Sequence, residues 1–111
     1  YPKDFTSGCT IEARGFQQRI KEFDNFNASV VGISADNEDD HESFCTSEKL
    51  GYTLLSDNSG TVSKAYNSWI DPYSKRNTFL ISPEGIIISR WIGVRPLGHS
   101  EEVLKELLKR Q

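Results

Sequence analysis

The chain has 111 residues, of which 36% are hydrophobic and 26% charged, and its net charge is -3. This composition predicts one globular domain, residues 1–111, with a single core, and it argues against a disordered chain. The negative charge gives no reason to expect nucleic-acid binding, which needs a basic face. No apolar run approaches the roughly 18 residues of a membrane span. Two cysteines fit structural thiols or a redox pair in a reducing compartment rather than a disulfide scaffold.

The opening segment, residues 2–10, is a loop that holds Cys9 and leads directly into a helix. Apolar residues then recur at the helical period, which predicts a helix over about 10–23, capped by Thr10 or a neighbour. Cys9 would lie at the N-terminal edge of this helix, where the partial positive charge favours a thiolate over a thiol. Cys9 is therefore a candidate nucleophile. The alternative is a buried cysteine that acts as a small hydrophobic residue.

The middle of the chain alternates between strands and helices. Residues 28–34 are rich in β-branched side chains and predict a buried strand. Asp36 or Asn37 can cap a second helix, which runs to about Leu50 and stops at Gly51. The next elements, in order, are a strand at 53–55, a turn at 57–60 and a short helix at 61–66.

The C-terminal part predicts a loop, two strands and a last helix. Residues 71–74 indicate the loop, and 78–82 and 86–92 the strands, joined by a tight turn with Pro83 and Gly85. Ser100 can cap the last helix, whose apolar stripe consists of Val103, Leu104, Leu107 and Leu108. The element order predicts an α/β domain with a mixed sheet and helices on both faces.

Thr6 lies three residues before Cys9, and Pro2 lies four before Thr6. This P-x-x-x-T-x-x-C pattern resembles the active-site signature of peroxiredoxins. The wider run YPKDFTSGCTIEARGF is similar to the peroxiredoxin Q group, also called bacterioferritin comigratory protein. The resemblance covers nearly the whole chain. It implies a thioredoxin-like fold with a mixed central sheet flanked by helices, and N-terminal strands that are missing from this chain.

The resemblance implies an antioxidant thiol peroxidase that reduces hydrogen peroxide and organic hydroperoxides. Cys9 would be the peroxidatic cysteine, whose thiolate attacks a peroxide oxygen and becomes a sulfenic acid. Negative charge then develops on the leaving oxygen, so hydrogen-bond donors placed there stabilise the transition state. Thr6 and the backbone N–H groups around Gly8 and Cys9 are the candidates. Pro2, with no N–H and a fixed φ, would shape and shield the pocket. Taken alone, Thr6 is more commonly a capping or turn residue.

An arginine beside the thiolate would stabilise it and help to hold the peroxide. The candidates are Arg14, Arg19, Arg76, Arg90 and Arg95. The run at residues 76–81 resembles the family segment in which an arginine precedes a strand and reaches the active site, which favours Arg76. The alternative is an ordinary solvated arginine at a strand end.

In the commonest peroxiredoxin Q arrangement, the second cysteine lies five residues after the first. In this chain that position is occupied by Arg14. Cys45 follows Cys9 by 45 − 9 = 36 positions, in the second predicted helix. Some members of the group are similar to this, and in them the first helix unwinds locally and an intramolecular disulfide forms. Cys45 is thereby implied as the resolving cysteine, although Cα atoms must come within about 7 Å. The alternative is a one-cysteine peroxidase in which Cys45 only packs beside Phe44.

The resemblance also implies thioredoxin or a similar dithiol as reductant, no cofactor, a monomer, and a cytoplasmic location, or a plastid one if a transit peptide has been removed. His41 and Cys45 share a helix face and could start a metal site, but no second Cys/His pair follows, so no metal is expected. Cys9 is not part of a C-x-x-C motif, which argues against a disulfide oxidoreductase. A non-enzymatic thioredoxin-fold module that binds a partner through its helix faces is the alternative from another class.

Overall fold

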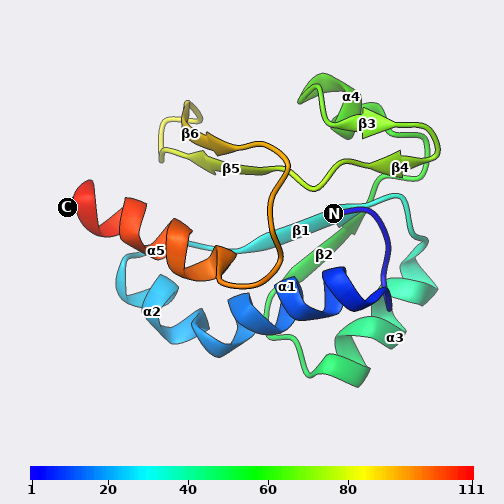
Figure 1. Cartoon of the computed structure of the whole chain (residues 1–111), viewed down its shortest axis with the longest axis horizontal. Coiled ribbons are helices and arrows are strands. Elements are labelled where there is room, and N and C mark those ends of the chain that lie inside the picture. Colours follow the sequence, from blue (N-terminus) through cyan, green and yellow to red (C-terminus); the bar gives the residue numbers. More distant parts are fainter.

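A computed structural model describes all residues, 1–111, as a set of helices and strands (Figure 1). The helices are α1 Ser7–Gln18, α2 Ile20–Asn25, α3 Glu38–Glu48, α4 Thr61–Ala65 and α5 His99–Lys109. The strands are β1 Val31–Ser34, β2 Thr53–Ser56, β3 Trp69–Ile70, β4 Tyr73–Ser74, β5 Thr78–Ile81 and β6 Ile87–Trp91. None of the helices combines the length and the apolar character that crossing a membrane requires.

The strands form three separate pairs. β1 and β2 run parallel, with Val31 opposite Thr53, whereas β5 and β6 run antiparallel, with Thr78 opposite Trp91. This combination of parallel and antiparallel pairing is the mixed arrangement that the sequence predicts. Hydrogen bonds do not join the β1–β2 pair to the β5–β6 pair. The third pair, β3 and β4, is a short antiparallel hairpin where a loop was expected at 71–74.

A cavity of about 340 Å³ lies between the β1–β2 and β5–β6 pairs. Mostly apolar side chains from β1, β5 and α1 line it, and Cys9 is on its wall. β1 pairs along one edge only, so its side chains are less covered than those of a central strand, and Val31 is 51% exposed. The prediction of a buried strand at 28–34 is therefore right only in part, since Ser34 is fully buried and Val31 is exposed, and the strand is also shorter than predicted.

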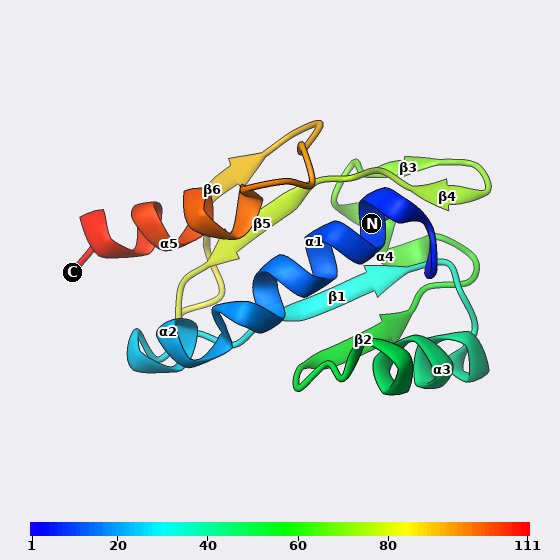
Figure 2. The same ribbon diagram turned by 60° about the horizontal axis from the view of Figure 1, so that its bottom comes forward.

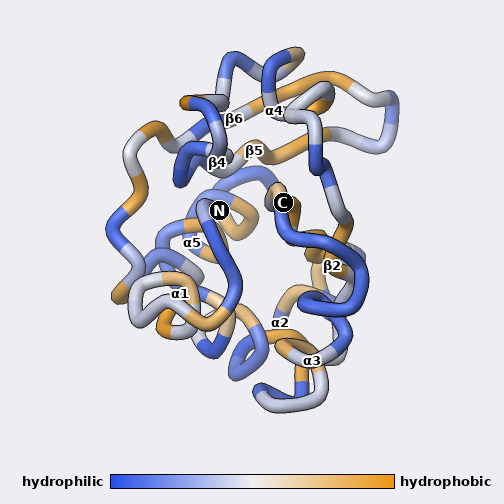
Figure 3. Tube along the Cα trace, turned by 90° about the vertical axis from the view of Figure 1, so that its right-hand side faces the viewer, coloured by the Kyte–Doolittle hydropathy of each residue, from blue (hydrophilic) through white to orange (hydrophobic).

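The helices gather mainly along one side of the strands. Figures 1 and 2 show α1 running beside β1, with α5 and α2 near one end and α3 beside β2. The core cluster joins Phe23 of α2 to Val103, Leu104 and Leu107 of α5, with residues of β5 and β6 packed against it. Figure 3 shows the hydrophobic colouring of β5, which faces this cluster. The stripe predicted on α5 is confirmed except at Leu108, which is 64% exposed because it lies at the edge of that face.

The first helix begins earlier than predicted. α1 starts at Ser7, with Thr6 in the N-cap position, and Arg19 separates it from α2. The predicted cap at Thr10 is therefore wrong, because Thr10 already donates its N–H to the Thr6 carbonyl at 2.9 Å. The consequence for the site is that Cys9 lies within the first helical turn.

At three other helix ends, one prediction is confirmed and two are wrong. Asn37 caps α3 as expected, since its side chain accepts the N–H of Asp40 at 2.8 Å. α3 ends at Glu48 and is capped by Lys49, whose φ of 54° is left-handed, rather than running on to a stop at Gly51. α5 begins after Gly98, so Ser100 lies inside the helix and does not cap it.

The side chain of Asp57 accepts hydrogen bonds from the start of the short helix α4, whose N-cap residue is Gly60. The Asp57 carboxylate accepts the N–H groups of Val62 at 3.1 Å and Ser63 at 2.7 Å. Burial alone would raise the pKa of Asp57, but these hydrogen bonds outweigh burial and lower it. We expect Asp57→Ala to reduce the free energy of unfolding at pH 7 by about 1 kcal/mol, the usual effect of losing a capping side chain.

The pH dependence follows from the lowered pKa of Asp57. A carboxyl with a lowered folded-state pKa stabilises the fold above its unfolded-state pKa, and this contribution is lost as the pH falls through the folded-state pKa. Urea unfolding at neutral and acidic pH should therefore show the deficit of Asp57→Ala shrinking in acid. Glu84→Ala, in an exposed turn, is the control. Equal deficits at both pH values would contradict the charged-cap interpretation.

Candidate active site

Cys9 lies buried in the first turn of α1, with 2% of its surface exposed. The first helical backbone bond is the one from Thr10 to Thr6, so the N–H groups of Ser7, Gly8 and Cys9 precede the helical ladder. These groups give the helix end its partial positive charge. Cys9 is thus buried, as expected for a cysteine that only packs, and it also lies at a positive helix end, as expected for a nucleophile.

Arg76 connects the region before β5 to the first turns of α1. Its Nη2 donates to Cys9 Sγ at 3.2 Å, and its Nη1 donates to Glu12 Oε1 at 2.7 Å. Burial alone would lower the pKa of Arg76, but Glu12 and Cys9 outweigh it and raise that pKa. The guanidinium is therefore a fixed positive charge against the sulfur. Two other arginine candidates pair elsewhere, Arg14 with Glu48 and Arg19 with Glu101.

Sequence reasoning missed what Glu12 and Gly8 do for the placement of Arg76. Glu12 is three residues after Cys9, hence on the same helix face, and its side chain is only 11% exposed. Gly8 matters through its missing side chain, since a Cβ there would lie 3.0 Å from Arg76 Nη2. The spacing from Cys9 could have indicated Glu12. The role of Gly8 depends on an approach between distant parts of the chain, which leaves no local signal.

The loop before α1 carries Pro2 and Thr6. Pro2 is half-buried and lines an open depression together with Arg76, Asn77 and residues of the β3–β4 hairpin. Thr6 is exposed, and its hydroxyl donates to the Lys3 carbonyl at 2.9 Å rather than capping α1. Its hydrogen is thus engaged within the loop and does not serve as the donor that the sequence suggested, while the Thr6 oxygen retains lone pairs that can accept a hydrogen bond.

The same loop contains a buried carboxylate that sequence reasoning also missed. Asp4 is 3% exposed, and its Oδ2 lies 2.6 Å from Nδ1 of His41, itself 4% exposed. The Tyr1 hydroxyl donates to Asp4 Oδ1 at 2.5 Å, and the Asp4 N–H donates to Asp36 Oδ2 at 2.9 Å. Burial raises the pKa of Asp4 above its usual range. His41, considered above only as a metal ligand beside Cys45, instead has both ring nitrogens engaged by protein oxygens.

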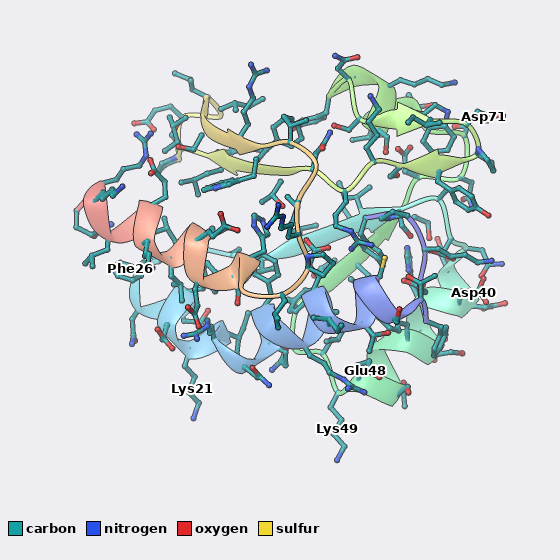
Figure 4. The ribbon with its side chains drawn as sticks, in the orientation of Figure 1. Lys21, Phe26, Asp40, Glu48, Lys49 and Asp71 are labelled. Carbon is teal, nitrogen blue, oxygen red and sulfur yellow. The ribbon has the colours of Figure 1, made fainter.

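Cys45 lies on α3 as a half-buried free thiol. Burial and the nearby Asp4 carboxylate raise its pKa. The Arg14–Glu48 ion pair joins α1 to this helix, and Figure 4 shows Glu48 close to α1. Arg14, the residue at the position of the commonest second cysteine, thus ties α1 to the helix that carries Cys45.

Comparison with known proteins assigns the family. The model of the AhpC/TSA family matches residues 1–90. The peroxiredoxin Bcp of Xanthomonas campestris pv. campestris is 36% identical over 115 residues, which cover 96% of this chain and 72% of that protein. The putative peroxiredoxin bcp of Coxiella burnetii is 39% identical, over 96% of this chain and 76% of that protein.

Solved structures support the same family assignment. The bacterioferritin comigratory protein of Xanthomonas campestris, whose structure was studied for alkyl peroxide reduction activity, has a TM-score of 0.95 at 32% identity, over 100% of this chain and 75% of that one. A cysteine-to-serine mutant of PrxQ from Xylella fastidiosa also has a TM-score of 0.95, at 34% identity, over 99% of this chain and 73% of that one. The chain therefore belongs to the AhpC/TSA family, within its peroxiredoxin Bcp/PrxQ group, and has the thioredoxin-like fold of that group.

Proposed function

We propose that this protein is a thiol peroxidase that reduces hydrogen peroxide and organic hydroperoxides, with Cys9 as the nucleophile. The supporting observation is the Arg76 guanidinium 3.2 Å from a sulfur that lies in the first turn of α1. A cation and a positive helix end acting on one sulfur both favour the thiolate. The activity named for the Xanthomonas campestris relative, alkyl peroxide reduction, fits this chemistry.

In the proposed first step, the Cys9 thiolate attacks the terminal oxygen of ROOH. An S–O bond forms and the O–O bond breaks. The electron pair leaves with RO⁻, which takes a proton from solvent and departs as ROH, while Cys9 becomes a sulfenic acid. Arg76 and the first N–H groups of α1 stabilise the developing charge. Thr6 accepts the hydrogen bond of the peroxide O–H, and Pro2 shields the pocket.

In the proposed second step, the Cys45 thiol attacks the sulfenic sulfur, releasing water and forming a Cys9–Cys45 disulfide. A dithiol such as thioredoxin then returns both sulfurs to thiols and is itself oxidised. PrxQ of Xanthomonas campestris was studied as serine mutants of two cysteines that are 36 positions apart, the spacing of Cys9 and Cys45. A relative that is 36% identical, over 98% of this chain and 50% of that protein, is the mitochondrial thioredoxin-dependent peroxide reductase of Drosophila melanogaster.

The resolving step is tested by adding one equivalent of hydrogen peroxide and analysing the protein by mass spectrometry. We expect wild type to form the Cys9–Cys45 disulfide and Cys45→Ser to retain a Cys9 sulfenic acid that dimedone traps. The rate of the first oxidation should stay within about twofold, since Cys45 takes no part in that step. Equal dimedone trapping in wild type and variant would instead indicate a one-cysteine peroxidase, with Cys45 inert.

A further inference from the structure

The loop that precedes Cys9 is fastened to α3 through the buried side chains of Asp4 and His41. His41 Nε2 lies 3.1 Å from the Leu55 carbonyl, which can only accept, so this nitrogen carries a proton. On the other side of the ring, Nδ1 lies 2.6 Å from Asp4 Oδ2, and one proton lies between them. This short bond between two buried groups is directional, and losing one partner leaves the other buried without its hydrogen bond.

A second contact fastens the next residue to the same helix. The Phe5 ring packs edge-on against the Phe44 ring, with centroids 5.2 Å apart. His41 and Phe44 are three residues apart, so they share one face of α3. Phe5 has a φ of 65°, a left-handed backbone that is uncommon for an aromatic residue and that its surroundings must hold. The loop therefore has a specific and restrained path.

The loop continues directly into the first turn of α1, which carries Cys9. Thr6 follows Phe5, and its carbonyl accepts the first helical bond of α1 from Thr10. A displacement of Asp4 would therefore move the Thr6 hydroxyl, which lies in the same loop, before the ladder of α1 begins. Arg76 holds Cys9 and Glu12 from a different part of the chain, so the Thr6 hydroxyl would shift relative to them.

We propose, given the proposed role of Cys9, that Asp4 and His41 are positioning residues for peroxide reduction. The pair holds Thr6 in register with Cys9 and Arg76. Asp4 and His41 act through the loop, since their side chains bond to each other, to Tyr1 and to Leu55 rather than to Cys9. Reaction with peroxide needs this register because a small misplacement of a hydrogen-bonding group is costly. Alkylation of Cys9 needs only a thiolate and access.

The test compares His41→Gln with a matched control, His99→Gln. His99 is equally buried at 1% exposure and bonds Thr78 Oγ1 at 2.8 Å, but it lies on α5, outside the Cys9 loop. Two rates are measured for each protein. One is oxidation of Cys9 by hydrogen peroxide, by rapid quench and mass spectrometry, and the other is alkylation of Cys9 by iodoacetamide.

We expect His41→Gln to oxidise about tenfold more slowly, as for other residues that orient a reacting group, and to alkylate within about threefold of wild type. His99→Gln should stay within about threefold in both rates. Asp4→Asn, which keeps the volume and one acceptor oxygen, should show the same separation of the two rates with a smaller fall, and it replaces His41→Gln if that variant does not fold.

The positioning role is overturned if both Asp4 and His41 variants oxidise like wild type, if the control falls as far, or if oxidation and alkylation fall together. The last result would mean that the pair acts on thiolate formation or on the fold as a whole. Wild-type protein that leaves peroxide intact would overturn the thiol peroxidase function itself. Normal wild-type oxidation with unaffected variants would overturn the positioning role alone.

Discussion

Cys9→Ser is expected to abolish peroxide reduction, with a fall in rate on the order of 10³ or more, because a serine hydroxyl stays protonated at neutral pH and is a poor nucleophile. Serine is close to cysteine in size, so the Arg76–Glu12 ion pair should persist and the fold should be retained. The measurement is the loss of hydrogen peroxide with dithiothreitol as reductant. Wild-type turnover in Cys9→Ser would exclude Cys9 as the nucleophile.

The fold of Cys9→Ser is checked separately. Trp69 and Trp91 report on different strands, β3 and β6, so their fluorescence during urea unfolding follows most of the structure. A single cooperative transition near the wild-type midpoint would show that the lost activity is chemical. A non-cooperative wild-type transition would favour the alternative, in which this chain does not maintain a catalytic pocket.

Arg76→Met is expected to slow the oxidation of Cys9 by about 100-fold or more, the typical effect of removing one donor from a developing anion. The loss has two parts. The sulfur loses its donor at 3.2 Å, and the nearly buried Glu12 carboxylate remains beside it without a counter-charge. A nearby like charge disfavours the thiolate. Alkylation by iodoacetamide should therefore fall as well, in contrast to His41→Gln.

Two further variants separate these parts. Adding Glu12→Gln to Arg76→Met removes the unpaired carboxylate and should restore much of the alkylation rate but little of the oxidation rate. Arg76→Lys keeps the charge but lacks the planar fork that reaches Cys9 and Glu12 together, so it should lie between wild type and Arg76→Met. If Arg76→Met oxidises at the wild-type rate, Arg76 has no part in the reaction.

The sequence predicts the elements around the site well because their signals are local. Helical periodicity places Cys9 at the start of a helix, and Asn37 followed by acidic residues places the start of α3 correctly. Arg76 is 67 residues from Cys9, so no local pattern could connect them. Its selection came from the resemblance of residues 76–81 to a family segment.

The elements that were misjudged depend on tertiary contacts or on weak local signals. β3 and β4 have two residues each, too few for a periodicity, and Pro72 between them suggests a loop. The end of α3 requires a left-handed residue, and Lys49 adopts that conformation although Gly51 is the better local candidate. The Asp4–His41 contact joins residues 37 positions apart, so no local pattern could connect them.

The two-way bonding of Arg76 has a consequence for catalysis. The guanidinium donates to the Cys9 sulfur and to Glu12 at once, and both partners belong to the opening turns of α1. Under the proposed chemistry, the reaction converts the Cys9 thiolate into a neutral sulfenic acid, so Glu12 is the one charged partner of this pair that Arg76 keeps. Oxidation of Cys9 would then weaken the electrostatic restraint on the first turns of α1, which must move toward Cys45 for the disulfide to form. Re-reduction of Cys9 would restore that restraint.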